Sequence, residues 1–84
     1  MINVQVRYFA SLREALGSGE TVQVNAGSNV AALRAGLIAT SAAHAAALSR
    51  ERSLRCAFDR RLCDETQLLR EGAEVAFFPP VTGG

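Results

Sequence analysis

The segment at residues 74–78, Glu-Val-Ala-Phe-Phe, constrains the fold of this chain most, because it predicts a strand that is apolar on both faces. Alternate side chains of a strand face opposite ways, so one phenylalanine lies on each side. A strand of this kind belongs in the middle of a sheet. Pro79 and Pro80 then end it, because residues without an N–H group cannot continue a hydrogen-bonded ladder. We therefore predict a domain over residues 1–78 and an extended tail over residues 79–84.

The predicted tail ends in two glycines with a carboxylate behind them. Glycine lacks a Cβ atom, so the backbone of another protein can approach this end closely. The prolines favour an extended arm, and residues 79–84 reach roughly 20 Å at most. A frayed terminus is the simpler alternative. We interpret the segment as an arm that threads into a partner, formed by Pro79, Pro80, Val81, Thr82, Gly83 and the reactive Gly84.

The first 25 residues predict two strands. Apolar residues alternate with polar ones over residues 2–9 and again over residues 20–25, so each segment has one face for the core. Residues 10–19 between them predict a turn of helix or a loop. Because the connection is short, we expect the two strands to form an antiparallel pair.

The next segment predicts helix. Apolar residues recur with helical spacing over residues 30–38, and Ser28 or Asn29 is suited to the N-cap. Gly36 weakens this helix by up to about 1 kcal/mol relative to alanine. The alanine-rich residues 39–47 predict helix as well, either as a continuation of the first helix or as a second one.

The order of the elements predicts an α+β fold of the β-grasp (ubiquitin-like) type. One main helix with a single apolar stripe covers one face of a mixed sheet. The last strand lies in the middle of the sheet, beside the first strand, and the helical crossover makes these two parallel. The remaining predicted elements are strands at residues 54–58 and 61–63 and a helical turn at residues 64–69.

The two cysteines fall on one predicted hairpin. If Asp59 and Arg60 form a two-residue loop, Cys56 faces Cys63 directly, at a separation that a disulfide can bridge. Asp-Arg is not a favoured pair for such a loop, and the cytosol keeps thiols reduced. We therefore expect two free thiols, with the disulfide as the alternative.

Phe9 and Phe78 are candidates for a partner-docking surface. They are out of phase with Tyr8 and Phe77, which we place in the core, so they fall on the face that the helix leaves uncovered. An apolar patch beside the tail is typical of a docking surface. In the alternative, the ends of the sheet curl and bury both rings.

Composition and motifs argue against several classes of function. A net charge of +1 gives no reason to expect binding to nucleic acid or to an anionic membrane. No segment approaches the about 20 apolar residues of a membrane span, so we expect a cytoplasmic protein. Two cysteines are too few for a four-ligand zinc site, and we expect no metal or cofactor bound to this chain. His44 has no cysteine or carboxylate close to it in the sequence, so we interpret it as a surface or packing residue and expect no enzyme acting alone.

The C-terminal stretch EVAFFPPVTGG resembles the end of the molybdopterin synthase small subunit family. Tyr-Phe-Ala at residues 8–10, Leu-Arg-Glu at residues 12–14 and the helix start at residues 30–34 resemble the same family, so the resemblance covers nearly the whole chain. There are two departures. Asp59 stands where the family commonly has asparagine, and residues 39–47 are unusually rich in alanine.

This resemblance implies a sulfur carrier, a subunit that is not catalytic by itself. In the family, an adenylyltransferase similar to ubiquitin-activating enzymes uses ATP and magnesium to adenylate the last glycine, here Gly84. Sulfide from a sulfurtransferase displaces AMP and leaves a thiocarboxylate. The carrier tail then enters the large subunit of a heterotetramer of two small and two large subunits, where its sulfur helps to build the molybdopterin dithiolene on a cyclic pyranopterin precursor.

Three other functions remain open from the sequence. They are sulfur delivery to thiamine or cysteine synthesis, protein modification of the ubiquitin type, and plain protein interaction with an idle tail. All nine basic residues are arginine, so no lysine amine can receive an acyl group. That absence fits a carrier that delivers sulfur rather than acylating its own side chains.

Overall fold

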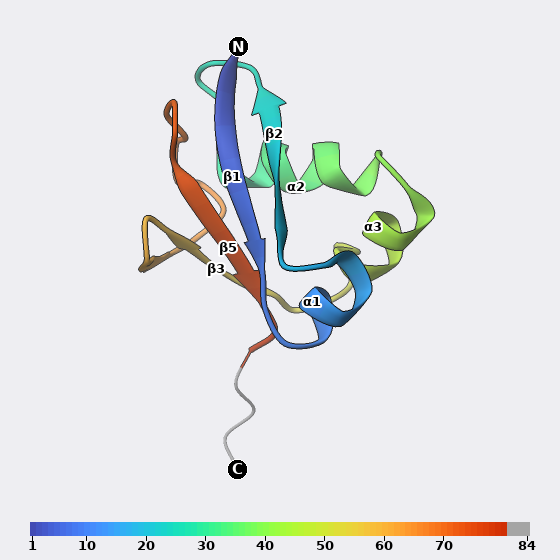
Figure 1. The fold of residues 1–84 in the computed structure, drawn as a ribbon. Coiled ribbons are helices and arrows are strands. Elements are labelled where there is room, and N and C mark those ends of the chain that lie inside the picture. The colour runs from blue at the N-terminus through green and yellow to red at the C-terminus, as the bar shows by residue number, and fades with distance from the viewer. Residues whose placement is uncertain (81–84) are drawn as a thin grey trace.

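Within residues 1–80, which the computed structural model describes, five strands form one sheet and three helices pack beside it (Figure 1). In chain order the elements are β1 (Ile2–Tyr8), α1 (Ser11–Leu16), β2 (Gly19–Val24), α2 (Val30–Ile38), α3 (Ala42–Ala47), β3 (Arg55–Phe58), β4 (Arg61–Cys63) and β5 (Glu74–Phe78). The N-terminus lies at one end of the sheet, and β5 ends at the opposite end (Figure 1).

The strand order β2-β1-β5-β3-β4 confirms the predicted β-grasp architecture. The last strand, β5, is central: it runs parallel to β1 and antiparallel to β3. Its Val75 pairs with Val6, and its Phe77 with Tyr8. The first two strands are antiparallel, also as predicted. Because β5 has a neighbour on each edge and an apolar residue on each face, its position follows directly from its sequence.

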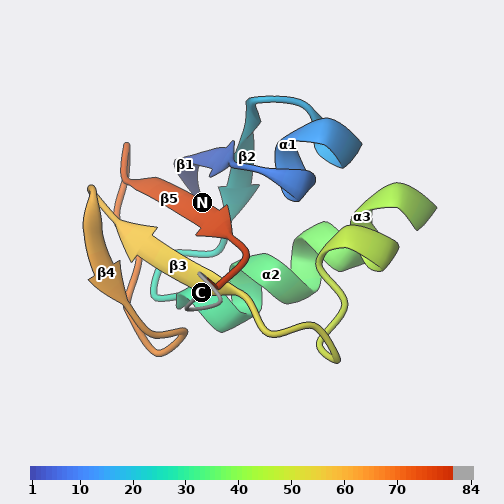
Figure 2. The same cartoon turned by 90° about the horizontal axis from the view of Figure 1, so that it is seen from below.

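The core lies between the sheet and the helices. Figure 2 looks along the sheet from the end where the chain leaves β5 and shows α2 and α3 on one face. Inward side chains of β1 and β5 meet leucines of the helices there, and none of them is more than 2% exposed; the set includes Val4, Val6, Tyr8, Val75, Phe77, Leu12, Leu33 and Leu37. A core of this size buries one helical stripe and one sheet face, which is the layering that a short domain can sustain.

The structure decides two alternatives that the sequence left open. Residues 39–47 do not continue the main helix but contain a second one, so α2 and α3 are separate helices, and residues 11–16 form the helix α1 rather than a loop. The break falls at Thr40 and Ser41, where the Thr40 hydroxyl donates to the Leu37 carbonyl over 2.6 Å. Ser41 then caps α3 by accepting the His44 N–H at 3.1 Å. None of the helices in the described part of the chain is long and apolar enough to cross a membrane.

The predicted helical turn at residues 64–69 is wrong. This segment is a loop that crosses the start of α2, with one bridge between Asn29 and Leu68. The carbonyls of Gln67 and Glu65 accept the N–H groups of Val30 and Ala31, at 3.0 and 2.9 Å. The first N–H groups of a helix lack partners within the helix, and this loop supplies two of them. The loop keeps one local turn bond, from the Gln67 N–H to the Asp64 carbonyl at 3.2 Å, and its bonds to the start of α2 hold it in this non-helical conformation.

Arg34 is the buried charged residue of α2, and it holds the loop that follows α3. Its side chain is 5% exposed. Nε donates to the Leu48 carbonyl at 2.8 Å, and Nη2 donates to the carbonyls of Ser49 and Arg52 at 2.5 and 3.1 Å. Nη1 pairs with Glu65 at 2.6 Å. One guanidinium thus joins α2 to two loops, because its planar fork presents several donors in fixed directions.

We expect Arg34→Ala to lower the free energy of unfolding by about 3 kcal/mol, because it leaves the buried Leu48 carbonyl and two partly buried carbonyls without this donor and removes the buried partner of Glu65. Urea unfolding followed by circular dichroism measures this loss. Arg50→Ala is the matched control, since Arg50 also contacts Glu65 but its side chain is 55% exposed; its expected cost is below about 0.5 kcal/mol. Equal costs for the two variants would contradict the role given to Arg34.

Candidate functional site

The base of the tail lies at the centre of the sheet. β5 ends at Phe78, which pairs with Arg55 of β3. On the other side, the Phe9 N–H donates to the Phe77 carbonyl at 3.2 Å, one residue beyond the end of β1. Pro79 and Pro80 follow and are half-buried. The chain therefore leaves the domain from a strand that is bonded along both edges.

The predicted tail residues divide between described and undescribed positions. Pro79 and Pro80 lie directly after β5, as expected. Val81, Thr82, Gly83 and Gly84, which carry the threading and the reactive carboxylate in the prediction, lie outside the described residues. The roles assigned to the tail therefore stay predictions.

The two phenylalanines proposed for docking lie beside the tail. Phe9 is 44% exposed, and Phe78 is half-buried, whereas Tyr8 and Phe77 are each 1% exposed. The expected phase is correct: Tyr8 and Phe77 pair across the sheet in the core. The alternative that both phenylalanines are buried does not hold for Phe9. Their contact with a partner is a prediction that the fold of the chain alone does not test.

A further apolar side chain on the same sheet face was missed in the sequence. The strand register aligns Ala76 of β5 with Ala57 of β3, and Ala57 with Leu62 of β4. Leu62 is 67% exposed and lies at the sheet edge. The helices pack on the opposite face (Figure 2). We call Ala57, Leu62, Ala76 and Phe78 the outer strip; only the register of three strands, β3, β4 and β5, brings these residues together, not local sequence.

The β3–β4 hairpin forms as predicted around Asp59 and Arg60. Both residues have positive φ, 48° and 70°, which is the geometry of the hairpin turn whose twist matches the flanking strands. The turn is fixed to β5: the Asp59 N–H donates to the Glu74 carbonyl at 2.8 Å, and Asp59 Oδ1 accepts the Glu74 N–H at 3.0 Å. Asp59 also pairs with Arg70. These contacts explain how a hairpin turn without glycine keeps two residues in the left-handed conformation.

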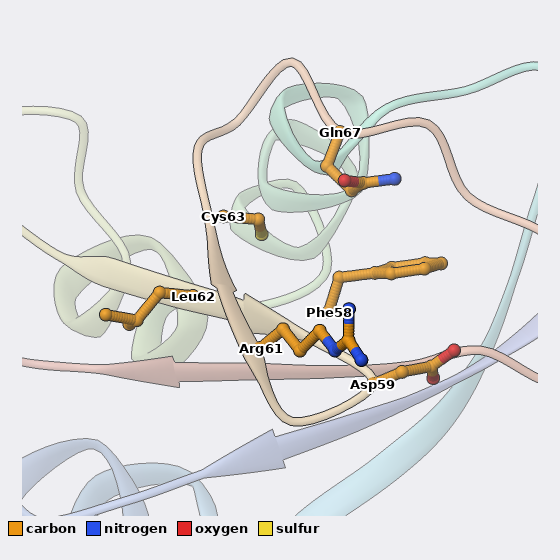
Figure 3. A pocket seen from close by; sticks show the side chains of 6 residues that line it. All are labelled: Phe58, Asp59, Arg61, Leu62, Cys63 and Gln67. Carbon is orange, nitrogen blue, oxygen red and sulfur yellow. The ribbon is translucent and has the colours of Figure 1, made fainter.

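A pocket of about 410 Å³ lies between this hairpin and the loop at residues 64–69 (Figure 3). The guanidinium of Arg70 lies over the Phe58 ring, 5.6 Å from its centroid. Figure 3 shows Leu62 pointing away from Phe58 and Gln67, onto the outer face. The lining residues are Phe58, Asp59, Arg61, Leu62, Cys63 and Gln67. Among residues 1–80 no group of three or more potential metal ligands comes together.

His44 contradicts the sequence prediction in one respect, because it does meet a carboxylate. Its Nε2 lies 2.7 Å from Glu20 Oε2, and the Tyr8 hydroxyl donates to the same oxygen at 2.7 Å. Nδ1 lies 2.7 Å from the Ser41 hydroxyl. The contact joins residues that are 24 positions apart, so only the fold could reveal it. The network ties α3 to β2 and fits the packing role that the sequence suggested.

The network also shifts proton affinities. Burial raises the pKa of the Tyr8 hydroxyl, and the Glu20 carboxylate that accepts its hydrogen bond raises it further. Burial alone would raise the pKa of Glu20, but the hydrogen bonds from His44 and Tyr8 outweigh it, and the pKa lies below its usual 4.5. Glu20 is therefore a carboxylate in the folded protein, and Tyr8 keeps its proton.

Comparison with known proteins identifies the family. The ThiS family model matches residues 6–84. The chain belongs to the ThiS family. It is 40% identical to the "Molybdopterin synthase sulfur carrier subunit" of Escherichia coli (strain K12) over 81 residues, which cover 96% of this chain and 99% of that protein. The predicted resemblance to molybdopterin synthase small subunits is thereby confirmed for this ThiS-family chain.

Solved structures share the fold. SAMP1 from Haloferax volcanii superposes with a TM-score of 0.72 at 27% identity, covering 98% of this chain and 99% of that one. Subunits 1 and 2 of the molybdopterin-converting factor from Helicobacter pylori 26695 have been solved as a protein–protein complex, and a chain of that structure superposes with a TM-score of 0.68 at 24% identity, covering 99% of this chain and 100% of that one. These neighbours confirm the β-grasp fold.

We expect Glu20→Gln to flatten the acid limb of the stability profile. Because the pKa of Glu20 is lowered by folding, its stabilisation is present above the unfolded value of 4.5 and is lost as the pH falls through the folded value. Urea unfolding at a series of pH values should show a smaller loss of stability below pH 4.5 in the variant than in the wild type. Glu51→Gln, at an exposed position, is the control and should keep the wild-type slope. A wild-type slope in Glu20→Gln would contradict the coupling.

Proposed function

We propose that this chain is the sulfur carrier subunit of a molybdopterin synthase. In this proposal the Gly84 carboxylate is adenylated, converted to a thiocarboxylate, and used to deliver sulfur to a cyclic pyranopterin precursor that becomes the molybdopterin dithiolene. The observation that carries the proposal is the near full-length likeness to the Escherichia coli sulfur carrier subunit. The diglycine end of the chain supplies the carboxylate that this chemistry needs.

The position of β5 supports this role. A carrier must hold the base of its arm steady while the tip enters a partner's site. Here the arm follows a strand bonded on both edges, through Arg55 on one side and Phe9 on the other. Pro79 and Pro80 restrict their own backbone at the base of the arm, which lowers the entropy lost when the arm is inserted. The domain therefore holds the base of the proposed arm at the end of a strand that is hydrogen-bonded on both edges.

The chemistry divides between this chain and its partners. A carboxylate is a poor electrophile, so a ubiquitin-activating-enzyme-like adenylyltransferase with ATP and magnesium would convert Gly84 to an acyl-adenylate and release pyrophosphate. A sulfurtransferase would supply the sulfide that attacks the carbonyl carbon and expels AMP. This chain supplies the carboxyl group, and it has no lysine side chain that could capture the activated carbonyl.

The intact mass of the protein tests this proposal. After incubation with the adenylyltransferase, ATP, magnesium and a sulfide source, the mass should rise by the difference between sulfur and oxygen. The gain should disappear when Gly84 is deleted. A Cys56→Ala/Cys63→Ser variant is the control for persulfides, which would add a whole sulfur atom to a thiol. No exchange of oxygen for sulfur, or a gain that survives removal of Gly84, would refute the proposal.

We propose that the surface of this chain that binds the large synthase subunit includes Phe9 and Phe78, with the outer strip beside them. These side chains flank the base of the arm, so a partner that takes up the tail also covers them. The small side chains of Ala57 and Ala76 make the centre of this sheet face shallow, and the larger Leu62 lies beside them. A shallow apolar face with an aromatic ring at its rim suits a protein partner. We propose a heterotetramer of two small and two large subunits as the working assembly.

Replacing Phe9 tests this surface. We expect Phe9→Ala to weaken binding to the large subunit about tenfold, because an exposed aromatic side chain at an interface contributes about 1–2 kcal/mol. Isothermal titration calorimetry gives the affinity. Leu68→Ala removes a side chain that is 62% exposed at the start of α2, away from the tail, and should bind like the wild type. Wild-type affinity in a folded Phe9→Ala protein would remove Phe9 from the interface.

Two alternatives keep the same activated tail. The likeness to SAMP1 at 27% identity favours a protein modifier, which would pass the activated carbonyl to a lysine of a target. Covalent conjugates of higher mass in cell extract would identify that role. A carrier for thiamine or cysteine synthesis would be recognised by the large subunit that co-purifies with it.

A further inference from the structure

The strand register places the two cysteines directly opposite each other. Cys56 of β3 pairs with Cys63 of β4, and their Sγ atoms lie 3.5 Å apart. Opposed residues of antiparallel strands have Cα atoms about 4.5–5.5 Å apart, within the range that a disulfide spans. A disulfide bond is about 2.05 Å long, so the sulfurs must approach by roughly 1.5 Å. Rotation of the side chains can provide that movement without a change of register.

The two thiols differ in their access to solvent. Cys56 is 5% exposed and lies in the core, whereas Cys63 is half-buried. Cys63 lines the pocket of about 410 Å³ in Figure 3, and both cysteines line a second pocket of about 330 Å³. Because Cys63 lines both pockets and more of it is open to solvent, a small molecule reaches Cys63 more readily than Cys56.

We propose that Cys63 and Cys56 form a thiol–disulfide exchange site, at which a low-molecular-weight disulfide such as oxidised glutathione converts the dithiol to an intramolecular disulfide. The site is independent of the sulfur-carrier function. Cys63 is the attacking thiol because it is accessible, and Cys56 is the resolving thiol because it is buried against Cys63. The resulting bond would fix the edge strand β4 to β3, the strand that borders the base of the tail.

The exchange takes place in two steps. The Cys63 thiol loses its proton, and its sulfur attacks one sulfur of the glutathione disulfide, forming a mixed disulfide and releasing one glutathione thiolate. Cys56 then loses its proton and attacks the Cys63 sulfur, which releases the second glutathione. Two electrons pass from the cysteines to the reagent. Burial, together with the hydrogen bond to Cys63, raises the pKa of Cys56 to about 12, so Cys56 is protonated in the reduced protein and is the poorer first nucleophile.

Intact mass after treatment of the folded protein with oxidised glutathione tests this order. The wild type should lose two hydrogens and retain no glutathione. Cys56→Ala should stop at the mixed disulfide and carry one glutathione, and Cys63→Ser should not react while folded. A wild-type protein that stays reduced, or that keeps glutathione as its final state, would overturn the proposal; so would reaction of folded Cys63→Ser.

Thermal unfolding supplies a second measurement that needs no variant. If the strands already hold the cysteines in bonding position, the oxidised wild type should unfold at a Tm about 5 °C or more above the reduced form, because the bond restricts the unfolded chain. A lower Tm after oxidation would show that the bond distorts the hairpin and would overturn the inference.

Discussion

The hydrogen bonding of β5 along both of its edges is the constraint on which the rest of the structure depends. Parallel pairing with β1 requires a crossover, and the chain between β2 and β3 supplies it through α2 and α3. Antiparallel pairing with β3 then fixes the hairpin, since Asp59 bonds to the Glu74 backbone in both directions. A strand with apolar side chains on both faces can occupy only this central place without exposing one of them. The same placement fixes the base of the tail.

Polar contacts fix the loops and helix ends that the apolar core does not hold. The buried Arg34 side chain donates to backbone carbonyls of the loop that follows α3. Carbonyls of the loop at residues 64–69 accept the first N–H groups of α2, which have no partner within the helix. These contacts give partners to backbone groups at the helix ends and in the loops, among them the buried Leu48 carbonyl. The Tyr8–Glu20–His44 network does the same for side chains and ties α3 to the sheet. A domain of 84 residues has few core side chains, so such contacts fix loops that apolar packing alone would leave loose.

Sequence reasoning succeeded where the signal is local or periodic. The alternation in β1 and β5, the cap at Asn29 and the two-residue loop that opposes Cys56 and Cys63 all follow from spacing. It failed where distant residues decide the outcome. Residues 64–69 could form a helical turn by themselves, but bonds to α2 give them another conformation. The contact between Glu20 and His44 spans 24 positions, that between Arg34 and Glu65 spans 31, and neither leaves a pattern in the chain. The outer strip could be found only from the register of β3, β4 and β5.

The parallel arrangement of β1 and β5 also separates the two ends of the molecule. β1 begins near the N-terminus, and β5 ends where the tail begins, at the opposite end of the sheet (Figure 1). A strand of seven residues is roughly 20 Å long. Met1 is 76% exposed, so a fluorophore, affinity tag or solid support attached there stands a full strand length from Phe9 and Phe78. A label or support on Met1 therefore leaves Phe9 and Phe78 free for the proposed contact with a partner, which suits the N-terminus to attachment in single-molecule and surface-binding measurements.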